Sequence, residues 1–438
     1  MNAKVVTIYE DYPNKLSDYS EHLGALNKLR NIIGARYFSL QVDGTLQIMH
    51  YVGFFQFGNT RIQILPKVYA KSSPGSLSNS EITDSIGFVY RLLYASGYLN
   101  VKKLLPQLQN ASGGDLLEIF IEIFISEFIK EFRKNVHRNY IQIEENQQFI
   151  KGKIIVSETV RRNPILKHLH YTRFDEFSIN NSLNQVFKSL ILLLLSKTKS
   201  VSNKKKLVIG LTYLQDVELV ALGESHFRKV KFNRLNNSFE PLFNLAKLFF
   251  YNQQPGLSEG EAETFSFLVP MHTLFERYLA TIFDSFSNTS FTFHYHCPRY
   301  YLGKEGNKNV FQLEPDFTVF SGSRCICILD AKYKYPFKDS EENENPDTKV
   351  STSDLYQLCT YALRYSSKIL VLIYPKFVGS PKDDSIISEY EIQSESGLVK
   401  LLIVQIDIIE KDMESISSNL YHVLTPYFDL ELIGRESV

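Results

Sequence analysis

Two aspartates and a lysine in the last third of the chain have the types and spacing to do chemistry. The stretch FQLEPDFTVFSGSRCICILDAKYKY (311–335) has the pattern of two short apolar strands joined by a turn. Asp316 lies on the first strand, and Asp330 and Lys332 share one face of the second. A turn centred on Ser323 predicts Asp316 opposite Asp330, at roughly 4.5–5.5 Å between Cβ atoms. Carboxylates that close repel, unless a divalent cation bridges them.

This arrangement favours phosphodiester hydrolysis. Hard oxygen ligands suit Mg²⁺, with Mn²⁺ as an alternative, and the bound ion lowers the pKa of its water and neutralises a scissile phosphate. Lys332 would place a positive charge against the negative charge that develops. The alternative is a solvated edge hairpin with incidental charges. The aliphatic runs beside both aspartates argue against full solvation.

A helix pattern follows the acidic loop. In DLYQLCTYALRY, Gln357 and Tyr361 are spaced i, i+4 and share one helix face, where both could simply pack or face solvent.

The histidine and cysteine pattern does not predict a zinc site. FHYHCPRY contains His294, His296 and Cys297, but no second pair follows at zinc-finger spacing. A packed strand is the better interpretation. Four cysteines in the whole chain suit a reducing compartment.

Composition and the termini indicate an ordinary globular protein. The chain has 438 residues, which suggests two or three domains, and 48 basic residues balance 48 acidic ones. Net charge therefore argues neither for nor against nucleic acid. Because the N-terminus lacks an apolar signal segment, and the apolar runs elsewhere are too charged or too short to span a bilayer, we expect a cytoplasmic protein.

Patterning predicts an α+β multidomain protein. Residues 37–71 have strand patterns with turns at Asp43-Gly44 and Gly58-Asn59, and they belong to a β-rich N-terminal domain over 1–80. A mainly helical region follows over 81–257, with strand-like text at 140–160 and a basic loop at 197–206.

A mixed α/β domain is expected over 258–438. Its pattern indicates a helix at 261–286, strands at about 290–296, 309–320 and 325–334, a helix at 353–366 and a strand at 368–374. Two more strands and a last helix should follow, and an acidic loop (336–350) interrupts the series.

The pattern P-D, fourteen residues, D-x-K resembles the PD-(D/E)xK nuclease superfamily. Nucleases of this superfamily often carry a helix beside the site, so by resemblance Gln357 would orient a water molecule or a phosphate. Some of them offer another carboxylate on the helix before the sheet, which makes Glu276, in LFERYLA, a candidate metal ligand. Apolar neighbours surround Glu276, so an edge residue without a metal role is the alternative. Outside that block, YVGFFQFGNTRIQILPKVY (51–69) is similar to the core of the N-terminal domain of the McrC family. IKGKIIVSETVRRN, DEFSINNSLNQVFKSL and MHTLFERYLATIF resemble later family segments in the same order. The resemblance runs in patches from about residue 45 to 375.

The resemblance implies a role in restriction. McrC proteins are the PD-(D/E)xK nuclease subunits of McrBC-type, 5-methylcytosine-specific systems, and they work with McrB, a GTP-hydrolysing AAA+ ring. By resemblance, segment 1–80 would dock into the ring and stimulate GTP hydrolysis, and segment 258–438 would cut methylated double-stranded DNA. Candidate ring contacts are Arg61, Lys67 and Lys71. The chain has no G-x-x-x-x-G-K-[ST] loop, so GTP would act only through the partner.

Two other functions stay open. A silent adaptor would only activate the partner GTPase, but it would have no need of Asp316, Asp330 and Lys332 together. A stand-alone repair or resolvase-type nuclease would not need the large non-nuclease portion.

Overall fold

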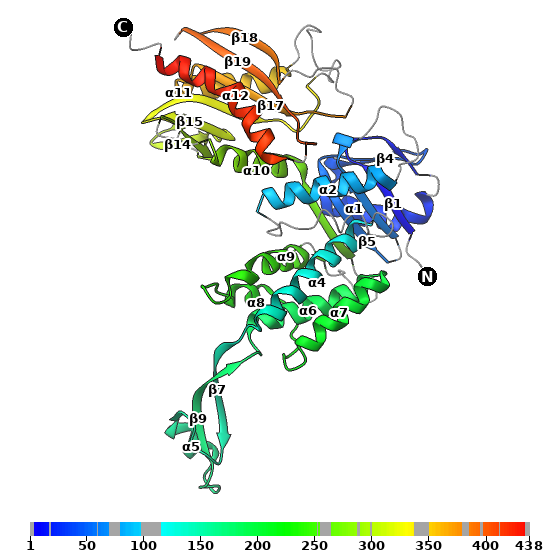
Figure 1. Ribbon diagram of the computed structural model, residues 1–438, viewed down its shortest axis with the longest axis vertical. Coiled ribbons are helices and arrows are strands. Elements are labelled where there is room, and N and C mark those ends of the chain that lie inside the picture. The colour runs from blue at the N-terminus through cyan, green and yellow to red at the C-terminus, as the bar shows by residue number, and fades with distance from the viewer. Residues whose placement is uncertain are drawn as a thin grey trace. The chain divides into compact units, whose positions relative to one another are not determined.

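The computed structural model places helices and strands along most of the chain (Figure 1). The described residues are 4–16, 19–58, 60–69, 79–97, 115–251, 253–254, 264–286, 290–297, 300–336, 350–378, 385–394, 397–410 and 412–433. The predicted polar connection after residue 71 and most of the predicted acidic loop lie outside this part of the chain. No described helix is both long and apolar enough to cross a bilayer.

The chain divides into two compact units. One comprises residues 1–3 and 98–267, and the other comprises residues 4–97 and 268–438. The N-terminal β-rich region therefore belongs to the same unit as the C-terminal sheet. The domain boundaries predicted from the sequence, 1–80, 81–257 and 258–438, stay predictions.

The N-terminal region of the second unit is rich in strands, as predicted. β1 (Lys4–Tyr9) runs parallel to β6 (Thr60–Leu65), which pairs antiparallel with β5 (Tyr51–Phe57). Apolar residues of α1 (Tyr19–Ile33) pack with this sheet in one core. The remaining elements are β2 (Asn14–Lys15), η1 (Ala35–Tyr37), β3 (Phe38–Leu40), β4 (Thr45–Ile48), η2 (Lys67–Tyr69) and α2 (Asn79–Ala95).

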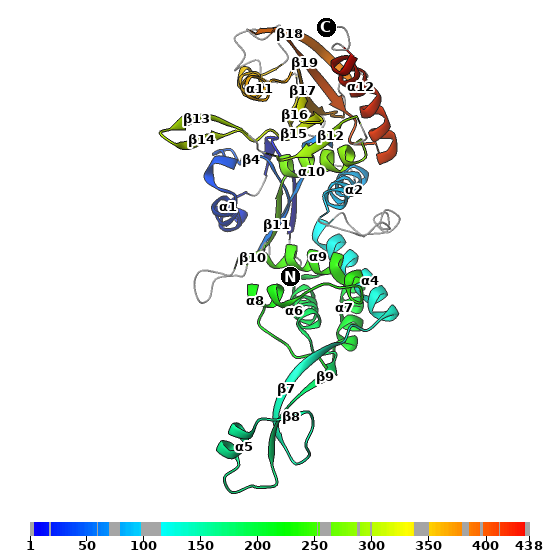
Figure 2. The same cartoon turned by 90° about the vertical axis from the view of Figure 1, so that its left-hand side faces the viewer.

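A six-stranded sheet forms the C-terminal half of this unit, in the order β12-β15-β16-β17-β19-β18. β16 and β17 run parallel, as do β17 and β19, whereas the other neighbours are antiparallel. Helix α11 lies on one side of the sheet and α12 on the other (Figure 2). The elements are α10 (Met271–Asp284), β12 (Thr292–Tyr295), β13 (Tyr301–Glu305), β14 (Lys308–Gln312), β15 (Phe317–Ser321), β16 (Arg324–Ala331), α11 (Thr352–Tyr365), β17 (Ile369–Pro375), β18 (Ile386–Ser394), β19 (Gly397–Ile406) and α12 (Met413–Ile433).

The first unit is a helical bundle with a long β-arm. Phenylalanine side chains of α4, α6 and α9 meet in its core, where Phe124 contacts Phe128, Phe187 and Phe249. The arm consists of β7 (Asn139–Gln147), β8 (Lys153–Ile154), α5 (Val156–Arg162) and β9 (His170–Ser178). The other elements are α4 (Leu116–Lys134), α6 (Ser182–Lys197), α7 (Val201–Tyr213), α8 (Glu224–Lys229), η3 (Asn237–Phe239), α9 (Glu240–Tyr251), β10 (Gln253–Gln254) and β11 (Thr264–Pro270), within which the two units divide.

The α+β fold class is confirmed, but three predicted elements were wrong in detail. The predicted helix 261–286 begins only at Met271, because TFSFLVP is a strand (β11) that ends at Pro270. The predicted basic loop is largely helix α7, which the Ser200 side chain caps by accepting from Asn203 N. The predicted strand 309–320 is two strands, β14 and β15, with a break before Phe317.

Candidate active site

A β-bulge sets the relation between the two aspartates. The turn residues Gly322 and Ser323 pair Ser321 with Arg324, and this register alone would place Asp316 opposite Leu329. A shift between Val319 and Phe320 moves the pairing by one residue, so that Phe317 lies opposite Leu329. Asp316, one residue before Phe317, therefore lies beside Asp330, as predicted. The predicted turn centred on Ser323 was wrong, because the turn is centred between Gly322 and Ser323, and the bulge compensates for the difference.

Both aspartates are held at the end of β16. Asp316 Oδ2 accepts a hydrogen bond from the backbone N–H of Ala331 at 2.8 Å. Asp330 is 1% exposed, so its carboxylate is almost completely removed from solvent. A buried carboxylate requires a compensating charge, and this site has two kinds of candidate: a bound cation and a lysine.

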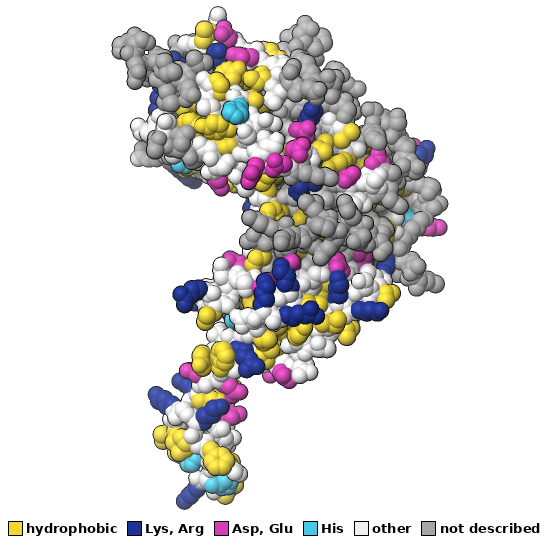
Figure 3. All heavy atoms as spheres, in the orientation of Figure 1, with side chains coloured by type: hydrophobic (Ala, Val, Ile, Leu, Met, Phe, Trp, Pro, Cys, Tyr) yellow, Lys and Arg dark blue, Asp and Glu magenta, His cyan; other side chains and the backbone are white. Residues whose placement is uncertain are grey.

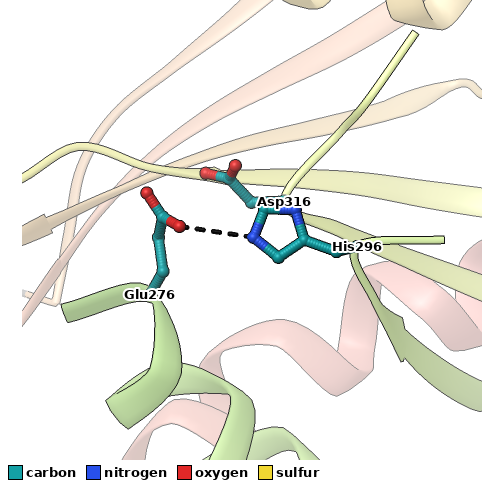
Figure 4. Close-up of side chains that lie close together, drawn as sticks. All are labelled: Glu276, His296 and Asp316. Carbon is teal, nitrogen blue, oxygen red and sulfur yellow. Dashed lines mark hydrogen bonds and ion pairs between the residues drawn. The ribbon is translucent and has the colours of Figure 1, made fainter. Parts of the chain in front are cut away.

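Three side chains from separate segments form a candidate metal-binding group (Figure 4). Glu276 lies on α10, His296 follows β12, and Asp316 precedes β15; one ligand atom of each lies within 4.8 Å of the others. His296 Nε2 lies 3.3 Å from Glu276 Oε2. The backbone N–H of His296 donates a hydrogen bond to the backbone oxygen of Asp316. His296 has a left-handed backbone (φ 43°), which is uncommon outside glycine and frequent at functional positions.

The carboxyl groups of this site repel one another. Burial, together with the charges of Asp330 and Glu276, raises the pKa of Asp316 to about 7. Burial and the charge of Asp330 raise the pKa of Glu276 to about 7. Burial also raises the pKa of Asp330. A divalent cation would relieve this repulsion, and two carboxylates and an imidazole are donors that suit one.

Lys332 lies directly against the buried acid. Its Nζ is 2.6 Å from Asp330 Oδ2 and 3.9 Å from Asp354 Oδ1. Burial lowers the pKa of Lys332, but the carboxylates of Asp330, Asp354 and Asp316 outweigh that effect and raise it. The ammonium is therefore charged at neutral pH, and it is held 20% exposed at the mouth of the site.

Helix α11 orients the lysine from the other side. Gln357 Oε1 accepts from Lys332 Nζ at 3.2 Å, and Gln357 Nε2 donates to the Tyr361 hydroxyl at 3.0 Å. Tyr361 in turn donates to the backbone oxygen of Glu314 at 3.3 Å, two residues before Asp316. The predicted i, i+4 pair is thus a chain of hydrogen bonds that links the lysine to the segment leading to Asp316.

The sequence missed two members of the site. Asp354 lies three residues before Gln357 on α11 and is 2.7 Å from Lys334 Nζ. Asp354 and Gln357 are spaced i, i+3, so the sequence already indicated that they share one face of the helix. His296 was weighed only for zinc, with His294 and Cys297. Among the described residues the candidate metal group contains neither of those two.

The predicted partner contacts are mostly inaccessible. Arg61 is fully buried on β6 and donates to Gln56 Oε1 at 2.8 Å. Lys67 is 8% exposed, and its Nζ lies 2.5 Å from Asp11 Oδ2. Lys71 lies outside the described residues. The burial of Arg61 and Lys67 argues against direct contact with another protein in this conformation.

Comparison with known proteins gives consistent matches. A family model described as "McrBC 5-methylcytosine restriction system component" matches residues 46–375. The type IV methyl-directed restriction enzyme EcoKMcrBC of Escherichia coli K12 is 24% identical over 283 residues, which cover 62% of this chain and 78% of that protein.

Two solved structures share the fold. One is a half-complex of Thermococcus gammatolerans McrB AAA+ hexamers with bound McrC: the TM-score is 0.73 at 21% identity, over 96% of this chain and 100% of the matched chain. The other is the McrBC complex of the same organism, with a TM-score of 0.51 at 24% identity, over 64% of this chain and 87% of the matched chain.

Proposed function

The chain belongs to the family of McrBC 5-methylcytosine restriction system components, and from that premise we propose that it is the Mg²⁺-dependent DNA endonuclease subunit of a GTP-driven, modification-dependent restriction complex. One observation carries the nuclease assignment. Asp316, Asp330 and Lys332 meet at the end of β16, with Glu276 and His296 beside Asp316.

The acidic side chains would hold the cation. Glu276, His296 and Asp316 present one ligand atom each, and Asp330 lies beside Asp316. When bound, Mg²⁺ would act as a Lewis acid that neutralises charge on the scissile phosphate and lowers the pKa of a bound water molecule.

Lys332 and Gln357 would supply the remaining electrostatics. Lys332 sits between Asp330 and Gln357, so its ammonium has a fixed direction. A preorganised positive charge stabilises the negative charge that develops on a phosphate in the transition state. Gln357, anchored by Tyr361, positions that ammonium.

The partner would be an McrB-like AAA+ ring that binds GTP. The similar structure from T. gammatolerans holds McrC on McrB AAA+ hexamers. Two surfaces of this chain could meet such a ring: segment 1–80, as predicted, and the β-arm. The arm carries exposed apolar side chains, which are visible in Figure 3, and this composition is typical of protein-binding surfaces. They include Tyr140, Phe149, Val160, Ile165 and Phe177.

Plasmid cleavage tests the proposal. The purified chain is incubated with Mg²⁺, with and without the AAA+ partner and GTP, on methylated and unmethylated DNA. We expect cleavage that requires partner, GTP and methylation, and that is lost in Asp330→Ala. Cleavage without the partner would instead identify a stand-alone nuclease. GTPase stimulation without any cleavage would identify an adaptor.

A further inference from the structure

A β-hairpin beside the candidate active site has no partner strand in the main sheet. β13 and β14 pair with each other as a separate two-stranded sheet in the described part of the chain. Figure 2 shows the hairpin extending outward from the six-stranded sheet. None of the residues 301–312 is buried. An isolated two-stranded hairpin is only marginally stable, so its exposed length contributes little to folding.

The hairpin is inserted inside the candidate metal-binding group. His296 lies just before it in the chain, and Asp316 lies four residues after β14 ends. A substrate phosphate held at these two residues would therefore lie beside the base of the hairpin.

The base of the hairpin is fixed to helix α11. Leu313 N donates to the Tyr300 backbone oxygen at 2.9 Å, which closes the two strands at their base. Arg364 Nε donates to the backbone oxygen of Tyr301 at 2.9 Å. Tyr300 also packs edge-on against Tyr365, at 4.6 Å between ring centroids. The same helix carries Gln357, so the hairpin and the catalytic lysine share one rigid support.

The exposed side chains suit a nucleic acid. Lys304 and Lys308 are both exposed, and Glu305 is the only acidic residue of the hairpin. Leu302 is 48% exposed and Phe311 is 73% exposed. Glu305 lies opposite Lys308, so the hairpin carries one net positive charge. A weakly basic, partly apolar surface of this kind complements a phosphate backbone with sugars and base edges beneath it.

We propose that the β13–β14 hairpin binds duplex DNA and holds it against the candidate active site. A two-stranded β-ribbon fits the major groove of B-DNA, where lysines contact phosphates and apolar side chains contact thymine methyl groups. This inference rests on the proposed nuclease function and adds to it the surface that receives the substrate.

Equilibrium binding to a fluorescein-labelled duplex in EDTA, where no cleavage occurs, tests the hairpin. The full chain carrying Lys304→Ala and Lys308→Ala is compared with wild type over a series of salt concentrations. We expect binding at least about tenfold weaker, and a slope of log K against log salt that is smaller by about 2, one for each lost phosphate contact.

The matched control is Lys368→Ala with Lys400→Ala. These substitutions also remove two positive charges. Lys368 is exposed, and Lys400 is half-buried and pairs with Glu389 at 2.9 Å. Both lie at the start of β17, away from the acidic cluster, since Lys368 precedes β17 and Lys400 lies opposite Ile369. We expect this control to bind almost as wild type does. Equal weakening by both pairs would mean that net charge alone matters, and it would overturn the hairpin proposal.

Phe311→Ala tests the apolar contact with no change of charge. We expect weaker DNA binding with an unchanged salt slope and an unchanged melting temperature.

If wild type cuts DNA and all hairpin variants bind like wild type, the hairpin proposal fails while the nuclease proposal stands. If the variants instead lose only the AAA+ partner or a second copy of the chain, the hairpin is a protein-docking surface and the DNA assignment is wrong. If wild type neither binds nor cuts DNA, both proposals fail.

Discussion

Lys332 and Lys334 both lie within 4 Å of Asp354, but only Lys332 also contacts the buried Asp330. Lys332 contacts Asp330 and Gln357, whereas Lys334 pairs with Asp354 at 2.7 Å. We therefore expect Lys332→Ala to lower the cleavage rate by about 100-fold or more, because a preorganised charge is lost from the reacting phosphate. Lys334→Ala is the matched control and should stay within severalfold of wild type. Plasmid cleavage with partner and GTP measures both, and equal losses would mean that the lysines act only through the fold.

The raised pKa values of the acids predict a pH-dependent stability. The folded pKa of Asp316 is about 7, well above that of an aspartate in an unfolded chain. Between these two values the unfolded state ionises first, so the native state loses stability as pH rises from about 4 to about 7. Below this window the carboxyl is protonated in both states, and its contribution disappears.

Asp316→Asn should remove this penalty. In EDTA we expect the variant to melt several degrees above wild type at pH 8 and near wild type at pH 4, since each kcal/mol shifts the midpoint by roughly 2–4 °C in a domain of this size. Mg²⁺ should raise the wild-type midpoint at pH 8 and leave the variant nearly unchanged. Thermal scans at the two pH values measure these midpoints. An Asp316→Asn midpoint below that of wild type at pH 8 would show that the carboxylates do not repel one another as inferred.

At the scale of single residues, sequence spacing identified what lies on one element. Asp330, Lys332, Gln357 and Tyr361 follow strand and helix periodicity, so their common direction could be predicted. His296 could not be assigned in this way, because its place beside Glu276 arises only when α10, β12 and β15 pack together. A ligand set drawn from three segments leaves no fixed spacing in the sequence.

Element prediction succeeded where one periodicity extended over a whole element. Helix α4 and the strands of the C-terminal sheet have such runs. Prediction was wrong at the segment 264–284, where a strand changes into a helix at Pro270 without an intervening polar loop. The β-bulge between β15 and β16 was also unpredictable, since its extra residue, Ile326 on β16, is an ordinary strand residue with no glycine or proline beside it. It nevertheless determines which residue faces Asp330.

A largely buried ion pair of the N-terminal region, Lys67 with Asp11, lies against the ring of Tyr333, just after β16. Lys67 lies 2.5 Å from Asp11, and its Nζ is 4.8 Å from the ring centroid of Tyr333, which follows Lys332. Glu10 also lies nearby, but burial raises its pKa to about 8, so it is mostly protonated at neutral pH. Asp11 is therefore the carboxylate that compensates Lys67.

Asp11→Ala should strongly destabilise this unit. The change leaves the Lys67 ammonium buried without its counter-charge, at a cost of about 3 kcal/mol. The double variant Asp11→Ala, Lys67→Met should recover a large part of that loss, because no buried charge remains. Urea unfolding of the single and double variants gives the coupling energy. Additive losses would show that the pair contributes only packing.

At the scale of the whole molecule, the chain leaves its second unit at residue 97, builds the helical first unit, and returns to the second unit at residue 268. Residues 4–97 and 268–438 form one compact unit, so removal of residues 1–80 would take strands out of the unit that carries the acidic cluster. Such a truncation cannot separate partner docking from cleavage. Point substitutions in the two units can, because each leaves the core of the other intact.

We expect two variants with opposite losses. Asp330→Ala should abolish cleavage and keep stimulation of the partner GTPase, since its change is confined to the acidic site. Phe149→Ser with Ile165→Ser should reduce GTPase stimulation about tenfold or more, because these arm residues are 80% and 87% exposed and offer apolar area to a partner. Leu235→Ser is the control: its side chain is 74% exposed in the same unit but lies off the arm. Steady-state GTP hydrolysis by the AAA+ partner, titrated with each variant, measures the effect. Full stimulation by the arm variant would return the docking role to the N-terminal segment, and lost stimulation in Asp330→Ala would mean that one surface serves both activities.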